Sequence, residues 1–240
     1  MIADIHPYPA YKDSGVPWLG KVPEHWDVRR LKSSVSNIIR PIAERNASDL
    51  YVALEHVESW TGRLRCAGPD VSFDSQVKQF QAGDVLFGKL RPYLAKVTRP
   101  ASNGVCVGEF LVLRPSAPNA TARYVEQLLR SKPIIDAVNA STFGAKMPRA
   151  DWQFVGGMPI VLPSLHEQAA IVRFLDHADR RIRRYILTKQ KLIKLLDEQK
   201  QAIIHQAVTA ASTPTSASSH PEWSGWGMYQ STGKLHRLVG

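Results

Sequence analysis

The segment at residues 164–209, in the second half of the chain, has the sequence SLHEQAAIVRFLDHADRRIRRYILTKQKLIKLLDEQKQAIIHQAVT. It contains no glycine or proline, which predicts one long helix. Ser164 and Glu167 have the spacing of a capping box, in which each side chain satisfies a backbone donor at the helix start. The helix would be about 68 Å long. A domain of about 160 residues offers a contact path of only about 30 Å, so much of this helix needs another partner.

Apolar residues recur along this helix in steps of four and three, a pattern typical of a coiled-coil seam. The seam consists of Ile171, Leu175, Ala178, Ile182, Tyr185, Leu192, Leu196 and Ile203, interrupted by the polar Lys189 and Gln199. We expect these apolar residues to form a dimerisation and partner-binding face. The alternative is an amphipathic helix that lies along its own domain.

The first part of the chain has a different pattern, because glycine and proline recur there at short intervals between short β-rich runs. We expect strands at residues 50–54, 84–87, 94–97, 105–113, 154–155 and 160–162, and helices at residues 122–129 and 133–139. The predicted fold class is therefore α+β, with a mixed α/β domain at residues 1–163 and one long helix at residues 164–210. Residues 211–240 are expected to be a flexible polar linker and an unassigned tail.

Composition limits the function classes. The chain has 240 residues, of which 44% are hydrophobic and 22% charged, enough for one ordinary core. Its 31 Lys and Arg against 21 Asp and Glu give a net charge of +10, which favours a polyanionic partner such as nucleic acid, with an acidic membrane surface as the alternative. The sequence shows no signal peptide and no apolar run of membrane-spanning length, so we expect a cytoplasmic protein.

No arrangement of residues typical of catalysis or metal binding is visible. The segment from Gly83 to Lys89 approaches a phosphate-binding loop, but Leu90 stands where the hydroxyl that ligands Mg²⁺ is required. The two cysteines, Cys66 and Cys106, are too few for a disulfide framework or a cysteine-based zinc site. We therefore expect no catalytic residue, no metal and no cofactor in this chain.

Two acid-free segments are candidates for DNA contact. Lys89, Arg91, Tyr93 and Lys96 lie between Asp84 and Glu109, and an extended conformation would put the first three on one face. Arginine offers a bidentate fork to guanine or phosphate, while lysine and tyrosine can reach phosphate oxygens. Lys146 and Arg149 occupy the second segment, in a loop shaped by glycine and proline. The alternatives are a solvated edge strand for the first segment and a structural turn for the second.

Four separated segments resemble the specificity subunit of type I restriction-modification systems. They are YKDSGVPWLGKVPEHWDVRRLK from Tyr11, GDVLFGKLRPYLAKV from Gly83, GAKMP from Gly144 and PSLHEQ from Pro163. The resemblance implies that residues 1–163 form a target recognition domain that reads one half of a bipartite DNA site. It also implies that the long helix packs on a counterpart and docks methyltransferase subunits, together with a restriction subunit where one exists. Cofactors such as S-adenosylmethionine would then belong to those partners.

The chain departs from this family in length, because a usual member has two recognition domains and two helices in tandem. We expect a half-length subunit that forms a homodimer through its helix and reads an interrupted palindrome. Two alternatives remain: a coiled-coil interaction protein whose charge is incidental, and a truncated or phase-variable fragment. Residues shared across a family cannot encode different targets, so we expect base-reading side chains at residues 40–48 or 58–76. Trp18 and Trp26 are expected to be packing anchors.

Overall fold

The computed structural model describes residues 7–16, 18–42, 49–65, 77–116, 118–144 and 146–212, with side-chain burial given as far as residue 209. The chain divides into two units, Met1–Ile182 and Arg183–Gly240. The strands are β1 (Tyr11–Asp13), β2 (Lys21–Pro23), β3 (Asp27–Arg30), β4 (Val35–Asn37), β5 (Pro41–Ile42), β6 (Leu50–Val52), β7 (Val77–Phe80), β8 (Val85–Gly88), β9 (Val97–Thr98), β10 (Gly104–Val107), β11 (Phe110–Pro115) and β12 (Pro159–Leu162). The helices are α1 (Ala122–Leu129), α2 (Lys132–Ala140), α3 (Trp152–Gly157) and α4 (Leu165–Ser212). The predicted α+β class is confirmed.

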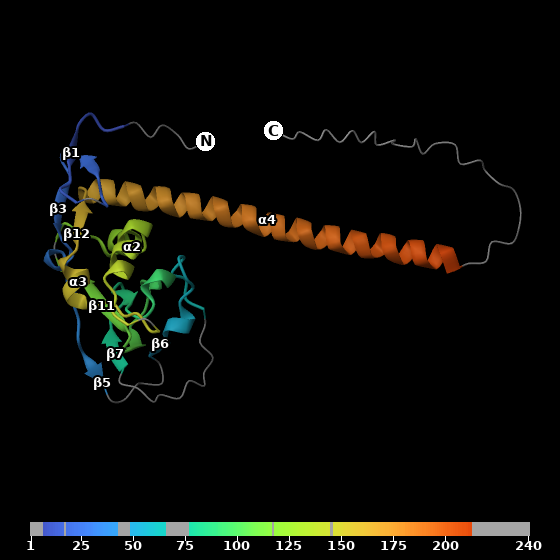
Figure 1. Ribbon diagram of the computed structural model, residues 1–240, viewed down its shortest axis with the longest axis horizontal. Coiled ribbons are helices and arrows are strands. Elements are labelled where there is room, and N and C mark those ends of the chain that lie inside the picture. Colours follow the sequence, from blue (N-terminus) through green and yellow to red (C-terminus); the bar gives the residue numbers. More distant parts are fainter. Residues whose placement is uncertain are drawn as a thin grey trace, which may run out of the picture. The chain divides into compact units, whose positions relative to one another are not determined.

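A central antiparallel sheet with strand order β4-β11-β8-β9 organises the first unit. Its strands β8 and β11 are apolar at successive positions because both faces of this sheet are buried. Phe87 and Leu111 belong to a core that includes residues of α1, α2 and α3, while Leu86 and Val112 belong to a second core. That second core includes residues of another sheet, with order β5-β7-β10-β6. Figure 1 shows α2 and α3 beside these strands.

Local signals explain most of the short helices. Thr121 caps α1 by accepting a hydrogen bond from the backbone of Tyr124, and Asp151 caps α3 by accepting one from Gln153. Pro133 lies in the first turn of α2, where the missing amide proton costs nothing. The structure confirms both helices that the sequence predicts, at residues 122–129 and 133–139.

Two expected strands are absent from the structure at these positions. Residues 154–155 belong to α3, because the Asp151 cap starts a helix there. Residues 94–97 contain the end of a 3-10 turn, Pro92–Leu94, and only Val97 from this run is in a strand, β9. The expected run at residues 105–113 is split into β10 and β11 by a turn at Gly108 and Glu109.

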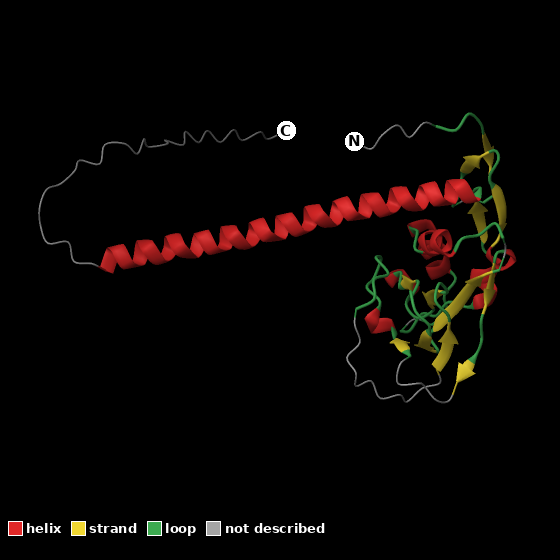
Figure 2. Ribbon diagram, turned by 180° about the vertical axis from the view of Figure 1, so that it is seen from behind, coloured by secondary structure: helices red, strands yellow, loops and turns green. Residues whose placement is uncertain are grey.

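The long helix is continuous from Leu165 to Ser212, which is 48 residues (Figure 2). Its start has the predicted capping box: the Ser164 hydroxyl accepts from the backbone of Glu167 at 3.3 Å, and the Glu167 carboxylate accepts from the backbone of Ser164 at 3.0 Å. The helix begins one residue after the expected boundary at residue 164, whereas the first compact unit extends to Ile182. The predicted linker and tail lie outside the described residues from residue 213 onward.

Gln168 attaches the first turn of α4 to the α+β domain. Its side chain is fully buried. Its carbonyl oxygen accepts from the backbone and hydroxyl of Thr121, both at 3.0 Å, and its amide donates to the carbonyl oxygens of Asn119 at 2.6 Å and Pro163 at 2.9 Å. These hydrogen bonds satisfy the buried amide group and join three segments at one point.

Replacing Gln168 with alanine is expected to destabilise the domain by about 2 to 4 kcal/mol, because it leaves the backbone groups of Asn119, Thr121 and Pro163 without their partner. The measurement is the free energy of unfolding from urea denaturation. Gln190→Ala, at an exposed position of the same helix, is the matched control and should change stability by less than about 0.5 kcal/mol. Equal effects of the two substitutions would contradict this role for Gln168.

Candidate nucleic-acid interface

The fold brings the two acid-free segments together. The backbone of Arg91 donates to the carbonyl of Pro148 at 2.8 Å, and the backbone of Ala150 donates to the carbonyl of Lys89 at 2.9 Å. Leu90 and Arg149 form the bridge between these two hydrogen bonds. Residues about 58 positions apart in the sequence therefore share one surface. We call Lys89, Arg91, Tyr93, Phe143, Lys146, Met147 and Arg149 the basic loop surface.

The first segment is not extended beyond Leu90, so the expected alternation of Lys89, Arg91 and Tyr93 on one face of a strand is wrong. Arg91 has a left-handed backbone with φ of 51°, and Pro92–Leu94 forms a 3-10 turn. Proline fixes its own φ and has no amide donor, which favours a turn over a strand here. The left-handed conformation costs an arginine of the order of 1 to 3 kcal/mol, and the hydrogen bond to Pro148 helps to hold it.

The six predicted DNA-contact residues have different surroundings. Arg91, Tyr93 and Lys146 are exposed, and Lys89 is half-buried. Arg149 is exposed and forms an ion pair with Glu109 at 2.8 Å. These five residues belong to the two loops that meet at the Leu90–Arg149 bridge.

Lys96 differs from the others because its ammonium group is already used inside the domain. It donates to the carbonyl of Leu54 at 2.6 Å, and burial lowers its pKa. This hydrogen bond ties the turn after β8 to the 3-10 turn at Leu54–His56. Of the six residues, Lys96 is the one whose charged group contributes most to the internal structure of the domain.

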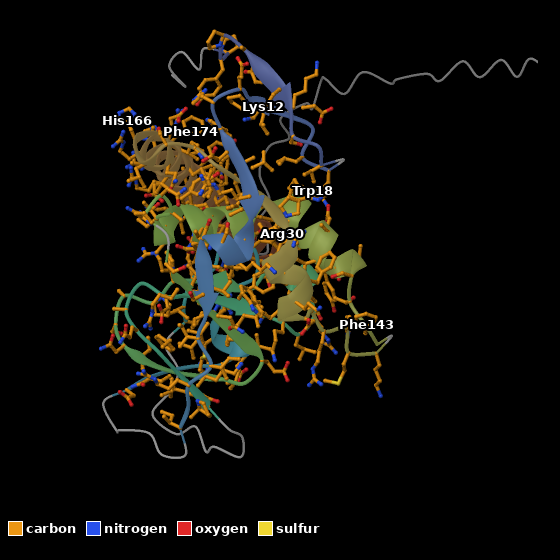
Figure 3. All side chains as sticks on the ribbon, turned by 90° about the vertical axis from the view of Figure 1, so that its left-hand side faces the viewer. Lys12, Trp18, Arg30, Phe143, His166 and Phe174 are labelled. Carbon is orange, nitrogen blue, oxygen red and sulfur yellow. The ribbon has the colours of Figure 1, made fainter. Side chains whose placement is uncertain are left out.

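Two exposed apolar side chains in the second loop were not predicted. Phe143 is 80% exposed and Met147 is 50% exposed. Figure 3 shows Phe143 at the outer edge of the domain. The sequence signal for them was a pair of apolar residues, Phe143 and Met147, in the acid-free loop that contains Gly144 and Pro148. Aromatic groups beside cations suit contact with bases or with sugar rings.

The segments predicted to carry base-reading side chains are only partly described. Residues 43–48 and 66–76 lie outside the described residues, as does Cys66. In the described part, Arg40 and Trp60 are exposed, whereas Glu58 accepts from Thr61 and pairs with Arg65. The assignment of target reading to these segments stays a prediction.

The predicted seam of α4 has two parts. Ile171 packs against the main core of the first unit and Ala178 is half-buried, whereas Leu175 between them is exposed. Beyond them the seam is exposed at Ile182, Tyr185, Leu192, Leu196 and Ile203. Every residue from Arg183 to Thr209 is exposed. Large apolar side chains exposed along one line are typical of an interaction surface.

Glu167 carries an unusual charge environment at the start of α4. The ring nitrogen Nε2 of His25 lies 2.7 Å from its carboxylate, and the indole of Trp26 donates to it at 3.1 Å. Burial alone would raise the pKa of Glu167, but hydrogen bonds from His25, Ser164 and Trp26 outweigh that effect and lower it to about 2. Trp26 is thus half-buried against the helix, and Trp18 packs against the main core, as expected of anchors.

No cluster of three or more His, Cys, Asp or Glu side chains suited to a metal is found among the described residues. Cys106 is buried, and burial raises the pKa of its thiol to about 12. Within the described part of the chain, no helix has both the length and the apolar character needed to cross a membrane.

The fold and the basic loop surface define an α+β domain that continues into a long helix with an apolar seam. The chain is similar to the type I restriction enzyme EcoDI specificity subunit of Escherichia coli, with 24% identity over 180 residues, covering 70% of this chain and 39% of the relative. It matches no protein-family model.

Two solved structures share this fold. The HsdS subunit from Thermoanaerobacter tengcongensis has a TM-score of 0.59 and 21% identity, over 83% of this chain and 52% of that one. A structure described as the basis of complex assembly and conformational transition of the type I R-M system has a TM-score of 0.60 and 22% identity, over 83% and 53%. The chain spans less than half of the E. coli relative and about half of these structures. The resemblance predicted from the four motifs is confirmed.

The charge of Glu167 makes a testable contribution to stability. Its pKa falls from an ordinary 4.5 to about 2 on folding, so the contribution is full above pH 4.5 and is lost as pH falls towards 2. We expect the wild-type chain to be more stable than Glu167→Gln at pH 6 and this advantage to shrink across that window. Urea denaturation of both proteins at several pH values measures it. A difference that stays constant from pH 6 to pH 2 would contradict the assignment.

Proposed function

We propose that this chain is the non-catalytic DNA-reading subunit of a cytoplasmic type I restriction-modification complex. Its α+β domain reads one half of a bipartite site in double-stranded DNA, and α4 pairs with a second copy and docks methyltransferase subunits. A restriction subunit joins where the system has one. The observation that carries this proposal is the exposed apolar seam on a helix whose first turn is fixed to a domain with a basic loop surface.

The basic loop surface supports the DNA-binding part. Arg91 and Lys146 are exposed cations on two loops that are hydrogen-bonded to each other, so their separation is set by the fold. A fixed pair of cations beside Tyr93 and Phe143 suits the combination of phosphate and base contacts that positions a protein on a duplex. If the positive charge of these loops were incidental, there would be no need for backbone hydrogen bonds that hold the two loops together.

The seam supports homodimerisation. Burying an exposed leucine contributes about 1.5 to 3 kcal/mol, and five large or medium apolar side chains recur along the exposed seam. A second copy supplies an identical seam, and closed two-fold symmetry satisfies both at once. Two chains would then hold two reading domains at a fixed separation, and the target would be an inverted repeat with an unread spacer.

Single-molecule methylation sequencing of a genome that carries this gene with its neighbouring methyltransferase gene tests the proposal as a whole. A methylated motif made of two inverted half-sites is expected. A motif with two unrelated halves, or no motif dependent on this gene, would count against one half-site per chain.

On the target found in this way, Arg91→Gln is expected to weaken binding by about 1 to 3 kcal/mol and relax the preference at one position if the arginine reads a base. Lys146→Gln is expected to weaken all sequences alike and to reduce the salt slope by about 1. Fluorescence anisotropy at several salt concentrations separates the two effects. Lys12→Gln, at an exposed lysine of β1, is the control. Unchanged affinity in both variants would remove the basic loop surface from the interface.

The double substitution Leu192→Glu and Leu196→Glu is expected to weaken pairing of the chain about a hundredfold or more, since two buried leucines contribute about 3 to 6 kcal/mol. Sedimentation velocity at micromolar concentration should change from a dimer to a monomer. Leu187→Glu places the same charge on the opposite side of the helix and should leave the dimer intact. A wild-type chain that is strictly monomeric, also with its methyltransferase, would refute pairing through α4.

A further inference from the structure

The middle of α4 carries a run of cations without any acid. Between Asp179 and Asp197 the helix contains Arg180, Arg181, Arg183, Arg184, Lys189, Lys191 and Lys194 and no aspartate or glutamate. Elsewhere the same helix has acids near its cations. A helix that is merely solvated or paired in a coiled coil is normally laced with both signs of charge.

Helical geometry places part of this run on one side of α4. At about 100° per residue, Arg184, Lys191 and Lys194 lie within an arc of about 80°. The seam residues Tyr185 and Leu192 lie about 80° to 120° from Arg184 and Lys191, and roughly opposite Lys194. We call Arg184, Lys191 and Lys194 the cationic stripe. All three are exposed, and Lys194 lies 3.8 Å from Glu198 in a pair that is largely open to solvent.

The charge on the stripe is not balanced by the acids that precede it. Asp176 pairs with Arg123 of α1, and Asp179 pairs with Arg63 at 3.7 Å, so both are already engaged by cations of the first unit. Lys191 and Lys194 are three residues apart and repel each other, which costs a few tenths of a kcal/mol in an isolated helix. An anionic ligand would turn this repulsion into attraction.

The composition of the stripe favours a polyanion over a protein surface. Protein interfaces have apolar and aromatic groups at their centre and few charges there. Leu187 and Leu195 are the exposed apolar residues that lie among these cations, whereas the apolar seam lies on a different side of the helix. Arg184 and Lys194 are about 15 Å apart along the axis, a distance that covers about four phosphates of one DNA strand.

We propose that the cationic stripe binds the phosphate backbone of the unread DNA spacer between the two half-sites. This inference rests on the proposed function, because it needs the seam to face a paired helix and the stripe to face outward. The stripe contributes affinity without sequence preference, so part of the salt dependence of binding resides in the helix and part in the reading domain.

The first test is the salt dependence of DNA binding by the full-length chain, with a mixed-sequence 30-bp duplex as the probe. The triple variant Arg184→Gln, Lys191→Gln and Lys194→Gln is expected to lower the slope of log affinity against log salt by about 0.9 for each phosphate that it no longer neutralises. The control Lys12→Gln, Lys21→Gln and Lys32→Gln removes the same charge from exposed positions of the first unit and should keep the wild-type slope. Equal slopes for the two triple variants would overturn the proposal.

A second control separates the loss of charge from altered folding. It is the charge-preserving triple variant Arg184→Lys, Lys191→Arg and Lys194→Arg. It is expected to keep the wild-type slope, and circular dichroism should show the same helix content in all variants. A reduction of the slope in this variant equal to that of the glutamine variant would overturn a role for charge.

The second test identifies the partner. Benzoylphenylalanine placed at Leu187, among the cations, is expected to crosslink to a labelled duplex on irradiation, and the same group at Tyr185 on the seam is not. Crosslinks from position 187 to a methyltransferase subunit alone would assign the stripe to an acidic protein surface and overturn the proposal. If the stripe variants leave the slope unchanged while Arg91→Gln still weakens binding, the proposed function stands without the stripe. If Arg91→Gln and Lys146→Gln leave binding unchanged while the stripe variant lowers the slope, the basic loop surface is removed from the interface and DNA contact by the helix remains.

Discussion

Gln168, a buried glutamine, fixes the first turn of α4 to the α+β domain. Gln168 is shielded from water, and its hydrogen bonds to Thr121, Asn119 and Pro163 offset the cost of burying its amide. Apolar packing at Ile171 and Val172 is nondirectional, whereas these hydrogen bonds require one orientation of the first turn. The joint therefore determines how the α+β domain continues into the first turn of α4.

Helix α4 has one continuous backbone, but its side chains lie in three different environments. Ile171 and Val172 in its first turns pack on the domain core, its seam is apolar and exposed from Ile182 onward, and another side is cationic at Arg184, Lys191 and Lys194. These requirements are compatible because the seam and the stripe lie on different sides of the helix. A partner on the seam therefore leaves the cations accessible.

The sequence predicted elements whose signals are local and missed those that depend on contacts between distant segments. The capping box at Ser164 and Glu167, the seam and the helix at residues 122–129 are all read from nearby residues. The turn after β8 was missed because a left-handed Arg91 is held by Pro148, a contact that only the fold creates. For the same reason the sequence named both basic segments but could not place them side by side, and it could not assign Lys96 to Leu54.

The motif residues that carry the family resemblance are largely used inside the domain. Asp84 is buried and forms two hydrogen bonds with Arg114, and Gly88 lies where a Cβ would come within 3.0 Å of Leu54. Residues with such internal roles are constrained by the fold, so under the proposed function the choice of target comes from other side chains that this frame carries. The Leu90–Arg149 bridge extends this frame to the surface, because a left-handed Arg91 in one loop depends on the carbonyl of Pro148 in the other. The two loops are thus expected to move as one unit, so that under the proposed function they would contact DNA together.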